Sequence, residues 1–123
     1  MNSFKKRILI VDDEPDTLEL METILEHEGY EIIKALNGME ALDLINENTD
    51  LVLLDVRMPE LNGIEVCKRM KSDPERKHIP IVIFSAKTLD HHIEEGLKAG
   101  ADEYITKPFS SSHLLGTLRK YLN

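Results

Sequence analysis

Five polar side chains of this sequence stand directly after short apolar runs, and together they could handle a phosphate group. Asp12 and Asp13 follow "ILIV", Asp55 follows "LVLL", Ser85 follows "IVIF" and Lys107 follows "YIT". Carboxylates crowded at one place need a counter-charge to stay ionised, and a hard cation is the simplest one. Oxygen ligands that leave room for water and a phosphoryl oxygen favour Mg²⁺ over a fully enclosed Ca²⁺, and zinc would need a sulfur or imidazole set.

The same five side chains contain the groups that a phosphoryl transfer uses. A carboxylate can act as a nucleophile and form an aspartyl-phosphate, while a metal ion and a lysine neutralise the transferring group. The Ser85 hydroxyl could donate a hydrogen bond to a phosphoryl oxygen. Singly, Asp55 could be a turn residue, Ser85 a helix N-cap and Lys107 a solvated surface charge. Their combination favours a site.

The other acids of "DDEPD" have a simpler explanation. Acidic side chains favour the first turn of a helix, and proline suits its first position. Glu14 and Asp16, on either side of Pro15, are therefore expected to start a helix. The pair Asp12 and Asp13 is less well explained by capping, because one acid suffices for a cap.

Short apolar runs alternate with longer amphipathic stretches five times, which is typical of β-α repeats around a parallel sheet. We expect strands over residues 7–11, 30–35, 51–54, 81–84 and 103–106, and helices over residues 15–28, 39–48, 64–72, 89–98 and 111–122. The runs "ILIV", "LVLL" and "IVIF" are apolar without alternation, as in central strands covered by helices on both faces. Ligands of such sheets bind outside the carboxyl ends of the strands, so the five polar side chains should converge there.

Composition limits the class of protein. The 123 residues are enough for one domain, and the net charge of −8 opposes binding to nucleic acid or to an anionic membrane. The first apolar run is too short for a signal peptide, and no stretch is long enough to span a membrane. The single cysteine, Cys67, has no partner for an internal disulfide, which favours a reducing cytoplasm. It lies on the apolar side of an expected helix, where core packing is its expected role.

The motifs and their order resemble those of a known family. The segments "ILIVDDEP", "LVLLDVRMPELNG", "IVIFSA" and "GADEYITKPF" are similar to the receiver domain of bacterial and archaeal response regulators, the CheY-like superfamily. The resemblance covers residues 5–122, so it implies a single receiver domain without a second domain. It implies a flavodoxin-like α/β fold, a three-layer sandwich with five helices and a five-stranded parallel sheet in the order 2-1-3-4-5.

The resemblance also implies roles for individual residues. It makes Asp55 the phosphoacceptor, which receives a phosphoryl group from a histidine kinase or a phosphotransfer protein. It assigns Asp12, Asp13, Asp55 and the backbone carbonyl of Arg57 to Mg²⁺, the implied cofactor. Lys107 would pair with the phosphate. A domain of this kind assists its own phosphorylation and dephosphorylation but is not an enzyme in the usual sense.

Two positions match the conformational switch of the family. Ser85 stands where a serine or threonine bonds the phosphoryl group, and Tyr104 stands at the aromatic switch position. In the family, the hydroxyl moves toward the phosphate and the aromatic turns inward, which rearranges the face made by the fourth helix, the fifth strand and the fifth helix. The implied partner of that face is a downstream effector protein or domain. Considered alone, an aromatic residue in a short strand also fits plain packing.

Loop residues near the acceptor complete the match. Met58, Pro59 and Gly63 match the loop that shapes its surroundings, although Gly63 also fits a simple turn. The bond between Lys107 and Pro108 matches one that is often cis in the family.

Two basic side chains stand at positions that vary in the family and influence how long the phosphate lasts. They are Arg57 and Lys87. Both could crowd or pair with the phosphoryl group, and both could equally be solvated.

The five histidines do not form an obvious site. His91 and His92 are adjacent and so do not share one face of a helix, and the other three fall in separate segments. We therefore expect no histidine metal or phosphohistidine site.

Two other classes of protein remain possible on a sheet of this kind. A metal-dependent phosphohydrolase with an aspartate nucleophile, as in haloacid dehalogenase-like enzymes, would need a second aspartate two residues after Asp55, where this chain has Arg57. It would also need a cap domain, and none is evident. A flavin- or nucleotide-binding module should present glycines or hydroxyls in its first loop, whereas "DDEPD" presents like charge.

Overall fold

The structure is a computed structural model that describes residues 5–58, 61–86 and 89–122. Strands and helices alternate along this part of the chain. The strands are β1 (Arg7–Val11), β2 (Glu31–Ala35), β3 (Leu51–Leu54), β4 (Ile81–Ser85) and β5 (Glu103–Thr106), and the helices are α1 (Pro15–His27), α2 (Gly38–Leu44), α3 (Gly63–Ser72), α4 (Asp90–Lys98) and α5 (Ser111–Leu122). The strands form one parallel sheet in the order β2-β1-β3-β4-β5, which confirms the predicted fold.

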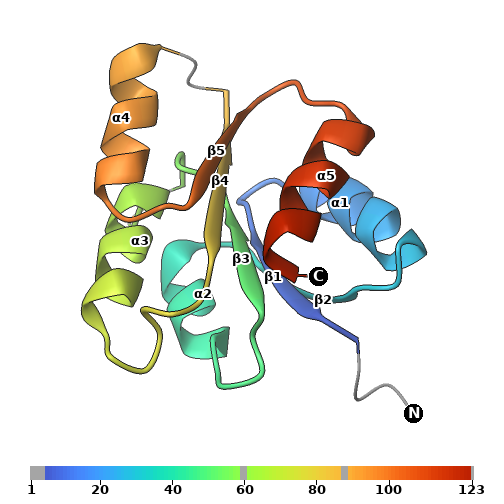
Figure 1. Cartoon of the computed structure of the whole chain (residues 1–123), viewed down its shortest axis with the longest axis horizontal. Coiled ribbons are helices and arrows are strands. Elements are labelled where there is room, and N and C mark those ends of the chain that lie inside the picture. The colour runs from blue at the N-terminus through green and yellow to red at the C-terminus, as the bar shows by residue number, and fades with distance from the viewer. Residues whose placement is uncertain (1–4, 59–60, 87–88, 123) are drawn as a thin grey trace.

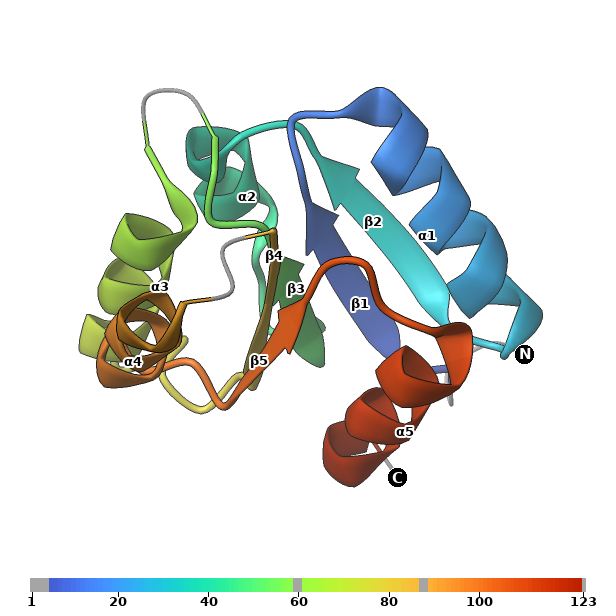
Figure 2. The ribbon, with the colours of Figure 1, turned by 90° about the horizontal axis from the view of Figure 1, so that it is seen from above.

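Helices cover both faces of this sheet, as Figures 1 and 2 show: α1 and α5 lie on one face, and α2, α3 and α4 lie on the other. Successive side chains of a strand point to opposite faces. In β3, Leu51 and Leu53 therefore join the core under α1 and α5, while Val52 and Leu54 join the core under the other three helices. This two-sided burial explains why the central strands are apolar without alternation.

Cys67 lies in the second of these cores, fully buried, as expected for a packing residue. Burial raises the pKa of its thiol to about 11. The thiol is therefore protonated near neutral pH and is a poor nucleophile.

The helix α2 ends earlier than expected, at Leu44 instead of residue 48. It also begins earlier, because the Asn37 side chain accepts a hydrogen bond from the Glu40 amide (2.7 Å) and so caps the helix. After Leu44 the chain turns extended at Ile45, and the Asn46 side chain accepts a hydrogen bond from the Asn48 amide (2.7 Å). Asparagine side chains compete with helical hydrogen bonding in this way, which the apolar pattern did not reveal.

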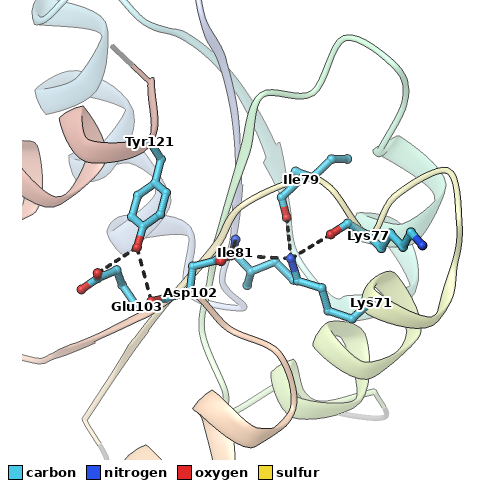
Figure 3. A network of polar contacts seen from close by, with 7 residues as sticks. All are labelled: Lys71, Lys77, Ile79, Ile81, Asp102, Glu103 and Tyr121. Carbon is cyan, nitrogen blue, oxygen red and sulfur yellow. Dashed lines mark hydrogen bonds and ion pairs between the residues drawn. The ribbon is translucent and has the colours of Figure 1, made fainter.

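A polar network ties the elements together at the amino ends of β4 and β5, away from the strand ends that carry the five polar residues (Figure 3). The Asp102 carboxylate accepts a hydrogen bond from the Ile81 amide (2.8 Å) and pairs with the Lys71 ammonium (3.5 Å). Lys71 also donates to the carbonyls of Lys77 and Ile79, at 3.1 and 3.0 Å. The Asp102 side chain thus fixes the start of β4 relative to α3.

The same network reaches α5 through a tyrosine. The Tyr121 hydroxyl donates to the Glu103 carboxylate (2.8 Å) and also contacts the Asp102 carbonyl (3.3 Å). Burial, together with its hydrogen bond to Glu103, raises the pKa of Tyr121 to about 12, so the hydroxyl stays a donor. The last turn of α5 is thereby attached to the beginning of β5.

Replacing Asp102 with Ala is expected to destabilise the protein by roughly 1–3 kcal/mol. The substitution leaves the amide of Ile81, a fully buried residue, without its carboxylate partner, and it removes the counter-charge of Lys71. Urea denaturation followed by circular dichroism measures the change. Asp43→Ala, in the exposed part of α2, removes the same charge and should change the free energy of unfolding by less than about 0.5 kcal/mol. Equal losses in both variants would contradict this role for Asp102.

Candidate functional site

The backbone hydrogen bonds of the sheet extend one residue beyond the strand ends. They hold the backbone of three predicted site residues in place. The Asp12 amide donates to the carbonyl of the last residue of β2 (3.1 Å), and the Asp55 amide donates to the carbonyl of the last residue of β1 (3.0 Å). The Lys107 amide donates to the carbonyl of Ser85, the last residue of β4 (2.7 Å). Each side chain therefore leaves a rigid backbone position at the same edge of the sheet.

The three acids meet at that edge as predicted. Asp12, Asp13 and Asp55 each offer a carboxylate oxygen, and these oxygens lie within 4.8 Å of one another. Asp12 and Asp55 are buried, with 0% and 5% exposure, whereas Asp13 is exposed. A pocket of about 300 Å³ opens here, and its lining includes Asp13, Asp55, Arg57 and Lys107. A group that enters the pocket therefore meets carboxylates from two strands.

Lys107 brings the positive charge. Its ammonium nitrogen lies 3.3 Å from Asp12 Oδ2 and 3.7 Å from Asp55 Oδ2. Lys107 thus faces two buried carboxylates, and within the group of Asp12, Asp13, Asp55 and Lys107 the negative charges outnumber the positive one.

The ionisation of Asp55 reflects this imbalance. Burial raises the pKa of Asp55 to about 6; the Lys107 charge acts in the opposite direction, and the negative charge of Asp12 adds to the rise. The amide of Arg57 also approaches Asp55 Oδ1, at 3.4 Å, and favours the ionised form. A further cation at the cluster would stabilise the carboxylate that a nucleophile requires.

The donor set at this edge fits a hard divalent cation. It consists of oxygen atoms, its two buried carboxylates share one lysine, and the pocket beside it has room for water or a phosphate group. Among the described residues, no other group of three or more histidine, cysteine, aspartate or glutamate side chains has its ligand atoms this close together.

Gly63 is required by close packing rather than by a turn. It is the first residue of α3, and its amide donates to the Val56 carbonyl (3.0 Å). A Cβ atom at this position would overlap the Asp55 carbonyl oxygen and would lie 2.9 Å from Val56 Cα. The glycine therefore lets α3 start directly against the backbone of the acceptor candidate. Met58 is buried nearby, whereas Pro59 lies outside the described residues.

The two switch candidates lie on neighbouring strands. Ser85 is fully buried at the end of β4, and the next residue, Ala86, lines the pocket. Tyr104 is partly buried on β5 and packs toward α4, where a Cβ atom on Gly96 would lie 3.0 Å from its ring. Their roles in switching stay predictions.

Of the two basic residues predicted to affect the phosphate lifetime, the structure describes one. Arg57 is exposed at the pocket, and Lys87 lies outside the described residues, so the paired effect proposed for them stays a prediction. The bond between Lys107 and Pro108 is cis, as in the matched motif.

Glu14 occupies the N-cap position of α1, but its side chain makes no capping hydrogen bond, and its amide donates to Asp12 Oδ1 (3.0 Å). Glu14 is also one of the residues that line the pocket.

One contact of the site was not predicted. The Lys107 ammonium lies over the ring of Phe84, 4.6 Å from its centroid. In the sequence, Phe84 is one more apolar residue of a central strand, and no pattern distinguishes it from its neighbours.

Comparisons with known proteins agree with this fold. The family model "Response regulator receiver domain" matches residues 8–119. The transcriptional regulatory protein YrkP of Bacillus subtilis is 40% identical over an alignment of 119 positions that covers 94% of this chain and 50% of YrkP. A putative response regulator from Chloroflexus aurantiacus is 34% identical with a TM-score of 0.91, covering 96% of this chain and 98% of that one. The chemotaxis protein CheY4 of Vibrio cholerae is 30% identical with a TM-score of 0.88, covering 95% and 98%.

The chain belongs to the response regulator receiver domain family, a family of signalling domains. It spans about half the length of the curated relatives it matches. In the described ranges, no helix is long and apolar enough to cross a membrane.

Proposed function

We propose that this receiver domain, residues 5–122, is switched by transfer of a phosphoryl group to Asp55, with Mg²⁺ held by Asp12, Asp13, Asp55 and the backbone carbonyl of Arg57. The observation that carries the proposal is the meeting of three carboxylates and one lysine at the carboxyl edge of the sheet. The donor is a histidine kinase or a phosphotransfer protein, and the site of action is the cytoplasm.

In the proposed phosphoryl transfer, each residue of the site has a separate role. An oxygen of Asp55 attacks the phosphorus of the donor, and the bond between phosphorus and the donor atom breaks, so that the donor keeps the electron pair. Mg²⁺ would neutralise charge on the phosphoryl oxygens. Lys107 lies 3.7 Å from Asp55 and would pair with a phosphoryl oxygen, to which the Ser85 hydroxyl would donate a hydrogen bond.

The positions of these groups support a proposal for the output. A new negative group on Asp55 would compete with Asp12 for Lys107 and would attract the Ser85 hydroxyl at the end of β4. Tyr104, on the neighbouring strand, contacts α4. We propose that these shifts change the face made by α4, β5 and α5, which binds a downstream effector protein or domain. The domain assists its own phosphorylation and dephosphorylation and is not otherwise an enzyme.

The phosphohydrolase alternative is not favoured. The family match covers residues 8–119, and the position two residues after Asp55 holds Arg57 where that enzyme class needs an aspartate.

An apolar groove beside the acid cluster is suited to the phosphodonor protein. It has a volume of about 630 Å³, lies between α1 and the segment before α5, and is lined by Leu20, Ile24 and Phe109 among others. Glu14, Ala86 and Lys107 line both this groove and the pocket. A protein seated in the groove would therefore hold its phosphohistidine next to Asp55.

The substitution Leu20→Glu is expected to lower phosphotransfer from a histidine kinase that phosphorylates the wild-type chain by roughly tenfold or more. Leu20 is 60% exposed, so the fold should be little affected, and phosphorylation by acetyl phosphate, which needs no docking, should be unchanged. Leu97→Glu, at a similarly exposed leucine of α4, is the matched control and should retain transfer from the kinase. Equal transfer to both variants would argue against this docking surface.

The proposed function is tested with acetyl phosphate and Mg²⁺, following the intact mass of the protein. The wild type is expected to gain the mass of one phosphoryl group, whereas Asp55→Asn gains none, because the amide is not a nucleophile of comparable strength. Asp43→Asn, an exposed site on α2, makes the same chemical change and should be phosphorylated normally. An adduct of equal yield on Asp55→Asn would overturn the assignment.

A further inference from the structure

We propose that Phe84 is a positioning residue whose ring holds the Lys107 ammonium against Asp55 during phosphoryl transfer; this inference rests on the proposed function. The ammonium lies over the ring, 4.6 Å from its centroid, within the range in which an aromatic face attracts a cation. It contacts Asp12 and Asp55 at the same time. The ring and the carboxylates therefore act on one charge.

The sheet geometry brings the two side chains together. Phe84 pairs in register with Ile105, and both belong to the core under α1 and α5. Because side chains alternate along a strand, the position two residues after Ile105 points toward the same face, and that position is Lys107. The lysine stem can thus cross the Phe84 ring on its way to the acid cluster.

A second aromatic residue fixes the orientation of the ring. Phe109 contacts Phe84 edge to face, with ring centroids 6.3 Å apart and an interplanar angle of 89°. Such an arrangement is a favourable one for two aromatic rings. Phe84 itself is fully buried, so the ring that faces the ammonium is held on several sides.

Lysine needs a restraint of this kind. Its charge sits at the end of a four-carbon stem with considerable rotational freedom. A divalent cation on Asp12 and Asp55 would weaken the attraction of these carboxylates for Lys107. The Phe84 ring carries no net charge, so its attraction for the ammonium would remain. The ring would then keep the ammonium in place when the acids are shared with a metal.

The main test is a double-mutant cycle between Phe84→Leu and Lys107→Met. Leucine keeps an apolar side chain in the core but removes the aromatic face. With acetyl phosphate and saturating Mg²⁺, Phe84→Leu is expected to slow phosphorylation roughly threefold to thirtyfold, the change that follows from typical cation–aromatic interactions. In the Lys107→Met background the same substitution should have no further effect. Equal slowing in both backgrounds would overturn the proposal, because the ring would then act without the lysine.

Controls separate positioning from packing. Val82→Ala lies on the same strand and in the same core, two residues from Phe84, and should leave the phosphorylation rate within about twofold of wild type after correction for the folded fraction. Phe109→Leu removes the edge-to-face contact and should slow the reaction less than Phe84→Leu does. A rate loss in Val82→Ala as large as in Phe84→Leu would contradict the proposal.

A second readout does not depend on phosphorylation. Carbon-13 relaxation of the Lys107 Cε methylene in the metal-free protein should show higher mobility in Phe84→Leu than in the wild type or Val82→Ala. If the wild type accepts no phosphoryl group but this difference is present, the proposed function fails while the ring still positions the lysine. If phosphorylation is normal and neither mobility nor the cycle responds to Phe84→Leu, the inference about Phe84 fails.

Discussion

Removal of divalent metal is expected to abolish phosphorylation of Asp55 by acetyl phosphate. The acceptor is one of three clustered carboxylates, and Lys107 is the lysine that pairs with two of them in the described part of the chain; an incoming phosphate would add negative charge to that cluster. Without a cation, burial and the negative charge of Asp12 raise the pKa of Asp55 to about 6, which shows that this site disfavours further negative charge at the acceptor. Intact-mass measurements in excess chelator should show no adduct, and added Mg²⁺ should restore it.

Substitution of one proposed Mg²⁺ ligand, Asp13, tests the metal site by itself. Asp13→Asn should weaken Mg²⁺ binding by roughly tenfold, because one charge near a divalent cation contributes several kcal/mol at intermediate dielectric and this exposed side chain is partly screened by water. Asp16→Asn is a matched control, since it removes an exposed charge from the first turn of α1 outside the three-acid cluster. Adduct formation that persists in chelator, or equal Mg²⁺ affinity in the two variants, would contradict the metal site.

The substitution Gly63→Ala is expected to destabilise the protein by about 1–3 kcal/mol or more and to slow phosphorylation. The added methyl group would collide with the backbone of Asp55 and Val56, so α3 or the acceptor loop must move. Urea denaturation measures the first effect, and the rate with acetyl phosphate measures the second.

Gly116→Ala provides the matched control for this glycine. Gly116 lies inside α5, and a Cβ atom there meets no atom within 4 Å. Its replacement should stabilise the protein by roughly 0.5–1 kcal/mol, because alanine is the better helix former. If both variants shifted stability in the same direction by similar amounts, close approach at Gly63 would not be the reason for that glycine.

Much of the fold could be predicted because its signals are local and repeated. The apolar runs around Ile8, Leu53 and Val82 identified the central strands, and the alternation with amphipathic stretches identified the parallel sheet. The meeting of Asp12, Asp55 and Lys107 followed from topology alone, since the carboxyl ends of parallel strands share one edge.

What could not be predicted depends on contacts between distant side chains or on the exact path of the backbone. The early end of α2 depends on competition by the side chain of Asn46, and the need for Gly63 depends on how closely α3 approaches the acceptor strand. Glu14 is a lining residue of the pocket, and its side chain makes no capping hydrogen bond to α1. The contact between Phe84 and Lys107 requires the register of β4 and β5, so composition and spacing carry no sign of it.

Locating the phosphoryl group on the chain tests phosphorylation of Asp55 most directly. After phosphorylation with acetyl phosphate and Mg²⁺, borohydride reduces an acyl phosphate on aspartate to homoserine, and peptide sequencing by mass spectrometry identifies the converted residue. We expect homoserine at position 55 in the wild type and none in Asp55→Asn. Homoserine at the position of Asp12 or Asp13, or a phosphoryl group found only on a histidine or serine, would contradict this expectation.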